Sequence, residues 1–300
     1  NLWWWYKLMM CSGVVASVFK PSDLSDLQAW YDAGDSSTIS SDVNGISQWA
    51  DKSGNNYHAV QTTNTQKPST GTSPDNGLPA VKFEFLNGSV PREVLRTDAP
   101  TWSFLHRTTF IVFTTTGASR STPYSHNYFR FKSGESGWGI LTAATVADLN
   151  FGAHVGEIYG MAGPSAGEPS NMAAVAQISA PNADILICQQ YKTTPSGVSG
   201  SYNFIQKNAL DKEDMTATVS SQLRVTDPAD GQTKSSVAFI GSKAAIGGGA
   251  NTFSNNSTQN PALIPNFQGT IQEICEYNRL LSDQERNQVM GYLLGKWRVT

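Results

Sequence analysis

Short runs of β-branched and aromatic residues recur along this chain, and Gly, Pro, Asn or Asp bounds each run. Runs of this kind predict many short strands joined by turns. In Ala80–Leu86 the apolar residues alternate with Lys82 and Glu84, as expected for a strand with one face in the core and one in water. Thr108–Thr116 is β-branched or aromatic throughout, which is typical of a strand buried on both faces. We therefore expect an all-β fold.

Further segments carry the same pattern, and we expect them to be strands. They are Leu27–Tyr31, Asn127–Phe131, Asp184–Tyr191, Tyr202–Ile205, Gln222–Val225, Val237–Ile240 and Phe267–Tyr277. Several predicted connections are long, among them Gly160–Ser170 and Gly247–Pro265. Long connections favour a Greek-key or jelly-roll path over a simple meander. The sequence thus predicts an antiparallel sandwich of two sheets.

A single helix is predicted, and it lies near the end of the chain. Ser282 and Glu285 have the S-x-x-E spacing of a capping box. Val289, Leu293 and Trp297 then recur every four residues, which forms one apolar stripe on a helix. We expect this stripe to pack on the sandwich. Upstream, Pro21–Leu24 is expected to form a turn or a short helical turn.

The 300 residues suit one large β-domain, in which roughly three quarters of the extended surface becomes buried. We expect an aromatic N-terminal arm over residues 1–20 and one jelly-roll domain over residues 21–300. The net charge is −3 and no basic stripe is present, so we expect no nucleic-acid partner. The N-terminal apolar stretch is too short to span a bilayer and lacks the features of a signal peptide.

Three cysteines are spread far apart, at Cys11, Cys188 and Cys275, without the spacing of a zinc site. Cys188 and Cys275 lie in apolar runs, and we interpret them as small buried side chains. A disulfide between one pair is the alternative.

The N-terminal arm is unusually aromatic, with the sequence LWWWYKLMM over residues 2–10. Two interpretations have equal weight. The segment packs against its own domain, or Trp3, Trp4, Trp5 and Tyr6 dock onto a partner protein. Anchoring to a membrane surface ranks third, because Lys7 is the only charge in the segment.

Two segments resemble a known family. The stronger is Phe267–Trp297, which is similar to the closing strand and helix of laminin-G-like, concanavalin A-like domains. There, an aromatic residue, Gly, Ile and Glu precede "L-S-x-x-E-R" and a helix that ends "Y-L-x-x-K-W". The matching positions here are Phe267, Gly269, Ile271, Glu273, Leu281, Ser282, Glu285, Arg286, Tyr292, Leu293, Lys296 and Trp297.

The second segment, Leu27–Phe85, is similar to the opening of the same domains. It holds a tryptophan strand, a "W-x-D-x-S-G" turn and a "G-x-P-x-V-x-F" strand. The matching positions are Trp30, Asp32, Trp49, Asp51, Ser53, Gly54, Pro79, Val81 and Phe83, while Glu84 stands where the family often has Asp. Residues 86–266 match only as a general pattern of strands.

With the aromatic leader before it, the opening segment also resembles virion proteins of tailed bacteriophages. This resemblance implies a non-catalytic recognition module, either a tail-fibre adhesin or a capsid decoration protein. The expected partners are other virion proteins, met through the arm, and host surface glycans. The expected location is the virion surface after assembly in the host cytoplasm, in a homo-oligomer or another symmetric assembly. The alternative is a secreted bacterial lectin-like protein.

A glycan hydrolase is a less favoured alternative, because catalysis on this fold needs two facing carboxylates about 5–5.5 Å apart for a retaining mechanism. Glu273 and Glu276 are the nearest pair, but a spacing of three puts them on opposite faces of a strand. We expect Glu273 to be partly buried, on the face of Ile271 and Cys275, and to bind loop backbone.

Calcium is implied by the resemblance, since many relatives bind it. Asp32, Asp35, Asp51 and Asn55 lie in the first two turns and could together supply oxygen ligands. The favoured alternative is that these side chains form Asx-turns.

A glycan site is expected around a hairpin in the stretch 124–138, which offers aromatic faces and hydrogen-bonding groups. The candidate residues are Tyr124, His126, Asn127, Tyr128, Arg130 and Trp138. The polar stretch Asn251–Asn260 is a second candidate. The alternative for the first stretch is an ordinary turn whose Phe129 and Phe131 belong to the core.

Overall fold

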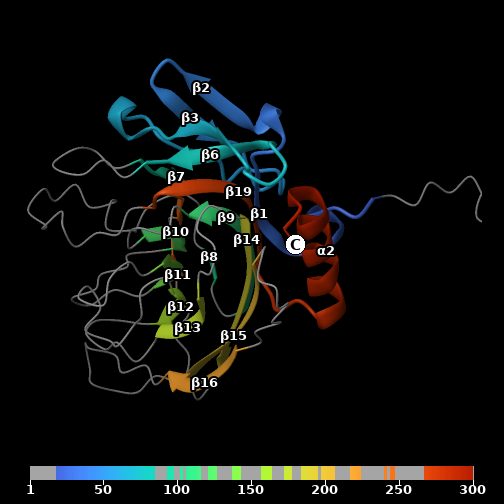
Figure 1. Ribbon diagram of the computed structural model, residues 1–300. Coiled ribbons are helices and arrows are strands. Elements are labelled where there is room, and N and C mark those ends of the chain that lie inside the picture. Colours follow the sequence, from blue (N-terminus) through green and yellow to red (C-terminus); the bar gives the residue numbers. More distant parts are fainter. Residues whose placement is uncertain are drawn as a thin grey trace, which may run out of the picture.

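The computed structural model describes residues 18–84, 93–97, 102–103, 106–115, 121–126, 137–142, 157–163, 172–177, 184–194, 197–206, 217–223, 240–241, 244–246 and 267–299. Two antiparallel sheets pack face to face, and helix α2 (Asp283–Trp297) covers the outer face of one of them (Figure 1). The predicted antiparallel sandwich with a C-terminal helix is confirmed.

The first sheet, here called sheet A, has eight strands. Along its main path the order is β16 (Ala217–Leu223), β15 (Gly197–Gln206), β14 (Asp184–Thr194), β9 (His106–Thr115), β19 (Gly269–Tyr277), β6 (Pro79–Phe83) and β5 (Ser69–Thr72). Strand β1 (Leu27–Asp32) pairs with β19 beyond the end of β6. The closing strand β19 therefore binds both early strands, which joins the two ends of the chain.

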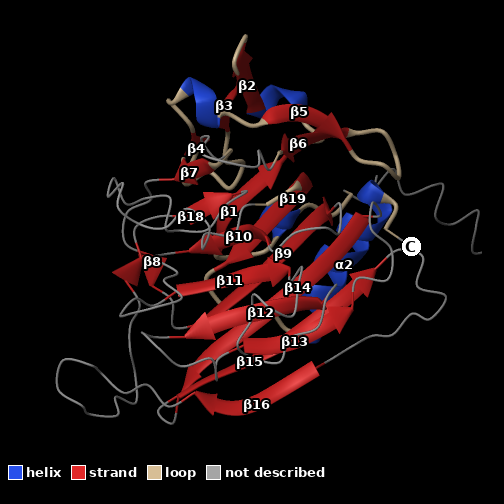
Figure 2. Cartoon of the chain, turned by 60° about the vertical axis from the view of Figure 1, so that its left-hand side comes forward, coloured by secondary structure: helices blue, strands red, loops and turns tan. Residues whose placement is uncertain are grey.

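The second sheet, sheet B, has nine strands and lies across the core from sheet A (Figure 2). Its order is β13 (Met172–Gln177), β12 (Glu157–Gly163), β11 (Gly137–Thr142), β10 (Ser121–His126), β18 (Ala244–Ile246), β7 (Leu95–Thr97), β4 (Ala59–Val60), β3 (Gly45–Trp49) and β2 (Ile39–Asp42). A separate small ladder joins β17 (Ile240–Gly241) to β8 (Trp102–Ser103). Within the described residues, the 3-10 helices Ser36–Thr38 and Asn64–Gln66 connect strands, and a further one, Pro21–Asp23, precedes β1.

Several sequence predictions are confirmed and one is partly wrong. The predicted helix begins after Ser282, with both hydrogen bonds of the capping box in place. The predicted Gly160–Ser170 loop is wrong over Gly160–Gly163, which belong to β12. The predicted strand Asn127–Phe131 and the loop 247–265 lie outside the described residues.

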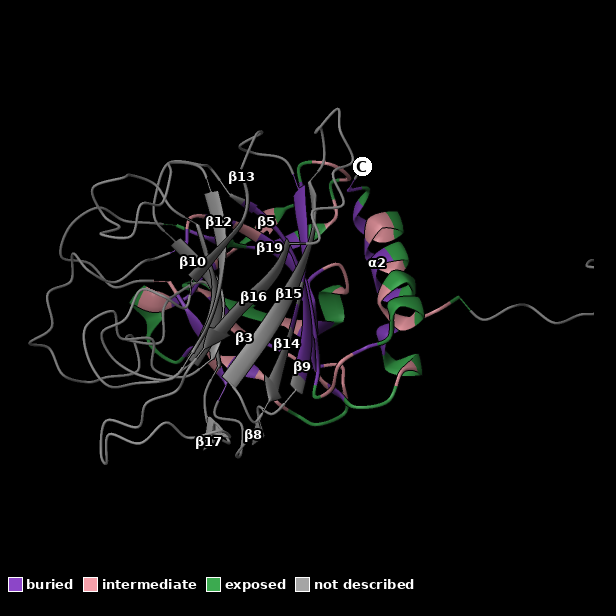
Figure 3. Ribbon diagram, turned by 90° about the horizontal axis from the view of Figure 1, so that it is seen from below, coloured by how far each residue is buried: buried purple, intermediate pink, exposed green. Residues whose placement is uncertain are grey.

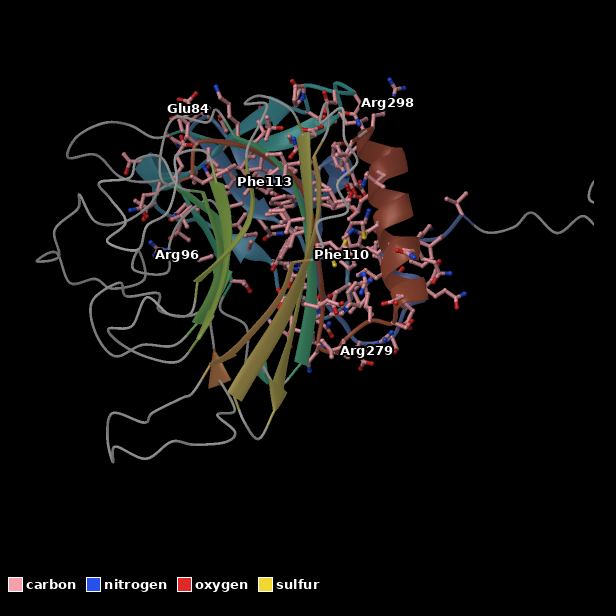
Figure 4. The ribbon with its side chains drawn as sticks, turned by 60° about the horizontal axis from the view of Figure 1, so that its bottom comes forward. Glu84, Arg96, Phe110, Phe113, Arg279 and Arg298 are labelled. Carbon is pink, nitrogen blue, oxygen red and sulfur yellow. The ribbon has the colours of Figure 1, made fainter. Side chains whose placement is uncertain are left out.

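The core has two sides because successive residues of sheet A alternate between faces. On β9, Phe110 points toward α2 and Phe113 toward sheet B (Figure 4). The helix side also holds Cys188 and Cys275, which are buried free thiols, as expected. On the helix, only the stripe that faces the sheet is buried (Figure 3).

Glycine is required where β19 enters sheet A. Gly269 has φ +150°, and a Cβ atom there would lie 1.9 Å from the carbonyl oxygen of Thr114. The backbones of β19 and β9 approach so closely at this point that no side chain fits.

Candidate functional site

The predicted hairpin in the stretch 124–138 is present, as strands β10 and β11. They pair antiparallel, with Tyr124 opposite Ile140 and His126 opposite Trp138. Residues directly opposite one another share a face of an antiparallel pair. The register therefore brings together His126 and Trp138, which are 12 positions apart in the chain.

The hairpin lies inside sheet B and not at its edge. Strand β10 is flanked on its other side by β18, with Tyr124 opposite Ile246, and β11 is flanked by β12. Since both strands form hydrogen bonds on both sides, their backbone is held firmly. A rigid platform of this kind suits recognition, because little conformational entropy is lost on binding. Asn127, Tyr128 and Arg130 lie outside the described residues, as does the second polar stretch, 251–260.

Of the four predicted calcium ligands, the three aspartates already accept hydrogen bonds from protein groups. Asp32 and Asp35 each accept a hydrogen bond from Nζ of Lys52, both at 2.8 Å. Asp32 also forms an ion pair with Lys296. The Asp32 side chain is nearly buried, at 4% exposure, so its charge requires such partners.

Asp51 and Asn55 bind the backbone of neighbouring segments. Asp51 accepts hydrogen bonds from the main-chain N–H groups of Trp30, Ser53 and Tyr57, at 2.8, 2.9 and 3.0 Å. Asn55 donates to the carbonyl oxygen of Leu27 at 2.9 Å. The bond from Ser53 to Asp51 closes an Asx-turn, and the bond from Ser37 to Asp35 closes a second one.

No group of three or more His, Cys, Asp or Glu side chains within the described ranges is placed to hold a metal ion. The hydrogen bonds of Asp51 connect β1 to the segment that follows β3. His58 takes part in this connection, since its Nδ1 accepts the N–H of Asp51 at 3.0 Å.

Glu273 is fully buried between β19 and α2, and its carboxylate accepts four hydrogen bonds. Trp30 Nε1 and Tyr292 Oη donate to Oε1, at 2.7 and 3.0 Å. Lys296 Nζ and Trp297 Nε1 donate to Oε2, both at 2.7 Å. The expectation that Glu273 binds loop backbone is wrong: all four partners are side chains, and three of them belong to the helix.

A β-bulge explains this arrangement. The pairing of β19 with β9 shifts register between Ile271 and Glu273, so the simple alternation of faces breaks there. Gln272 and Glu273 consequently both point to the helix side. Gln272 donates to Asp184 Oδ1 at 2.6 Å, while Glu273 binds α2. Ile271, which the alternation placed beside Glu273, lies outside the helix-side cluster.

The pKa of Glu273 is raised, although opposing charges act on it. Burial raises the pKa of Glu273, and the negative charge of Asp32 acts in the same direction, whereas Lys296 lowers that pKa. Burial likewise raises the pKa of Tyr292 far above its ordinary value. Lys296 also lies over the ring of Trp297, 5.0 Å from its centroid. The cluster therefore joins helix to sheet through charge-assisted contacts.

Glu276 points to the opposite face of β19 and forms an ion pair with Arg107 of β9. Both side chains are buried, at 0% and 1% exposure. Glu273 and Glu276 thus lie on opposite faces of the strand, as the spacing predicts, so these two carboxylates do not face one another across a common site.

Asp184 is the centre of a buried polar cluster that sequence reasoning missed. Its carboxylate accepts hydrogen bonds from Ser73 Oγ and Thr114 Oγ1, both at 2.5 Å, and from Gln272. The cluster joins β9, β14 and β19 to the turn after β5. The only sequence signal for this cluster is an acidic residue at the start of an apolar strand. Strand ends that are exposed to solvent show the same signal, so it does not indicate burial.

No helix in the described portion of the chain is long and apolar enough to cross a membrane. The arm residues Trp3, Trp4, Trp5 and Tyr6 lie outside the described residues, so the arm stays a prediction.

No protein-family model and no curated protein matches this sequence. Similar solved structures include a Trypanosoma rangeli sialidase in complex with 2,3-difluorosialic acid, with 12% identity, a TM-score of 0.46, and coverage of 91% of this chain and 33% of the sialidase. A second is a structure from work on cell entry of botulinum neurotoxin type C, which depends on two ganglioside molecules. It has 8% identity and a TM-score of 0.49, and the match covers 91% of this chain and 52% of the toxin chain.

A third is the binding domain of botulinum neurotoxin DC in complex with rat synaptotagmin II, with 9% identity, a TM-score of 0.44, and coverage of 91% of this chain and 52% of the other. This chain thus spans about a third of the sialidase and about half of the toxin chains. At these identities and scores the likeness says nothing about what this chain binds.

Proposed function

We propose that this chain is a non-catalytic recognition module that binds surface glycans through the β10–β11 hairpin. The observation that carries the proposal is the register of this hairpin, which sets His126 opposite Trp138 inside a nine-stranded sheet. An aromatic residue and a hydrogen-bonding residue at opposite positions of one hairpin suit a sugar, which has an apolar face and a rim of hydroxyl groups. Helix α2 covers sheet A, on the far side of the sandwich (Figure 1).

Glu273 and Glu276, the nearest pair of acids in the sequence, are not arranged for hydrolysis. Glu273 is enclosed by four donors and Glu276 is paired with Arg107 on the other face. A hydrolase would need two carboxylates that face the substrate together. We therefore propose that the protein is not an enzyme, and hydrolysis of a bound glycan would contradict this.

We propose further that the module is carried on a bacteriophage virion, on a tail fibre or on the capsid surface, as a laminin-G-like domain. Support comes from the Leu27–Phe85 and Phe267–Trp297 motifs and from the aromatic leader with Trp3, Trp4, Trp5 and Tyr6. In this proposal the leader docks onto other virion proteins in a symmetric assembly. A secreted lectin-like protein is the alternative, since it would bind glycans without attaching to a particle.

The test of glycan recognition is a broad glycan array probed with the purified protein, with calcium or with a chelator. Selective binding to one class of glycan supports the proposal. Loss of binding on chelation would place a cation in the site. Absence of selective binding under both conditions would overturn glycan recognition and favour a decoration protein whose partner is the particle itself.

The test of the leader is deletion of residues 1–10. The described helix-side core begins at Phe19, which packs on Tyr292, so the shortened chain is expected to keep its thermal transition. It should no longer co-sediment with particles that retain the full-length protein. Unfolding of the shortened chain would show instead that the leader belongs to the core of its own domain.

A further inference from the structure

The tip of the β2–β3 hairpin is a chemically sensitive point in the chain. Val43 and Asn44 form the tip, between the paired residues Asp42 and Gly45. Val43 is fully exposed, and Asn44 is exposed as well. The main-chain N–H of Asn44 donates to the Asp42 carboxylate at 2.8 Å, which holds the tip in place.

The fold requires glycine immediately after Asn44. Gly45 has φ +126°, a backbone conformation that glycine adopts far more readily than other residues. A Cβ atom there would lie 2.6 Å from the carbonyl oxygen of Pro68, which accepts the N–H of Ile46 at 2.7 Å. The nitrogen that follows Asn44 therefore has no side chain to shield it.

Asn76–Gly77 is the second Asn-Gly pair within the described residues, and its surroundings differ. The Asn76 side-chain Nδ2 donates to the carbonyl oxygen of Lys296, in the last turn of α2, at 2.8 Å. Its Oδ1 accepts the N–H of Leu78 at 2.9 Å. Both ends of this amide are therefore held, and a carboxylate here would face the negative end of the helix.

We propose that Asn44 is a site of spontaneous deamidation in the folded protein, and that Asn76 is protected from the same reaction. The main-chain nitrogen of Gly45 attacks Cγ of Asn44, and a new C–N bond closes a succinimide. The bond from Cγ to Nδ2 breaks, and Nδ2 leaves as ammonia with the proton from the Gly45 nitrogen. Water then opens the ring to aspartate or isoaspartate.

The reaction alters the charge at this edge of sheet B. A new carboxylate forms beside Asp42, which is paired with Lys67 at 2.5 Å. The Lys67 side chain is nearly buried, at 6% exposure, so it stays close to the hairpin and the added charge. The isoaspartate product also lengthens the backbone in a turn of two residues, which disturbs the register of β2 against β3.

The experiment is incubation of the intact protein in mildly alkaline buffer made with oxygen-labelled water, followed by peptide mapping by mass spectrometry. Labelled Asp and isoAsp should appear at position 44 about tenfold or more faster than at position 76, because the two hydrogen bonds of Asn76 must break first. In denaturant the two sites should react at similar rates. Equal rates in the folded protein, or faster reaction at Asn76, would overturn the proposal.

Three variants separate the local cause from general unfolding. Asn44→Gln keeps the polar tip and should remove the part of the charge change that peptide mapping assigns to position 44, while any change from the third Asn-Gly pair of the sequence, Asn87–Gly88, stays. Asn76→Asp imitates the product at the protected site, and its unfolding free energy should fall while Asn44→Asp stays near the wild-type value. A charge change of undiminished wild-type size in Asn44→Gln would assign the reaction elsewhere and contradict the proposal.

Discussion

The indole Nε1 of Trp297, in the last turn of α2, donates to the carboxylate of Glu273 at 2.7 Å, and both side chains are fully buried. Trp30 of β1 donates to the other oxygen of the same carboxylate at 2.7 Å. One buried acid thus joins the first strand, the last strand and the terminal helix. This relationship gives the Trp, Glu and Trp positions of both family-like segments a common physical role.

Glu273→Gln should lower the free energy of unfolding by about 3–5 kcal/mol, the usual cost of breaking a buried charge pair. The amide group would turn an N–H toward one of the four donors and remove one of the two carboxylates that pair with Lys296, the other being Asp32. Urea unfolding followed by tryptophan fluorescence measures the effect. Glu84→Gln is the control, because the Lys82–Glu84 pair is about half exposed and should contribute under about 1 kcal/mol. Equal losses of unfolding free energy in Glu273→Gln and Glu84→Gln would show that the hydrogen bonds of Glu273 stabilise the fold no more than an exposed ion pair does.

Gly34→Ala and Gly291→Ala should change stability in opposite directions. A Cβ atom on Gly34 would lie 3.2 Å from both Lys296 Cε and Trp297 Cη2, so the variant should lose about 1–3 kcal/mol through crowding. A Cβ atom on Gly291 meets no atom within 4 Å, and alanine in a helix should stabilise by about 0.5–1 kcal/mol. Calorimetric melting temperatures test both. A stabilised Gly34→Ala would mean that α2 packs less closely on the turn after β1.

The buried Arg107–Glu276 pair should behave non-additively. Arg107→Met alone should cost about 3–5 kcal/mol because it leaves the Glu276 carboxylate without this ion pair in a buried site. Arg107→Met combined with Glu276→Leu should recover most of that loss, since a well-packed apolar pair removes both desolvation penalties. A double-mutant cycle measures the coupling. Simple addition of the two single losses would show that the pair is not energetically linked.

Acid should weaken the start of α2 through Glu285. The hydrogen bond from Arg279 is the main cause that lowers the Glu285 pKa from 4.5 to about 2. The Glu285 carboxylate then binds a proton more readily in the unfolded state than in the folded state. The stabilisation that ionised Glu285 gives the folded state is therefore complete above pH 4.5 and is lost as pH falls toward 2. Glu285→Gln, which can still form a capping box, should flatten the pH dependence of unfolding in this window. An unchanged slope would contradict the prediction.

The elements with strong local signals could be predicted from sequence. Strand Thr108–Thr116 and the helix after Ser282 have clear periodicity and capping, and the structure has β9 at His106–Thr115 and α2 at Asp283–Trp297. Strands β12 and β13 were missed because they are rich in Gly and Ala, which weaken a strand signal that depends on β-branched and aromatic residues.

The environment of Glu273 could not be predicted, for a different reason. Alternation along β19 holds only up to the bulge after Ile271, and a bulge depends on how neighbouring strands pair. The partners of Glu273 lie 243 positions away at Trp30 and 24 positions away at Trp297. A linear pattern carries no information about contacts at such separations. The hairpin, in contrast, has its two strands close together in the chain and was predicted.

The most direct test of the central claim is the affinity of Trp138→Ala for the glycan that the wild-type protein binds best, measured by titration calorimetry. Val43→Ala is the matched control, because Val43 is fully exposed at the far edge of the same sheet. We predict that Trp138→Ala weakens binding about 30-fold or more, the effect of an aromatic hot spot worth ~2 kcal/mol, with an unchanged melting temperature. Wild-type affinity in Trp138→Ala would contradict recognition through the β10–β11 hairpin.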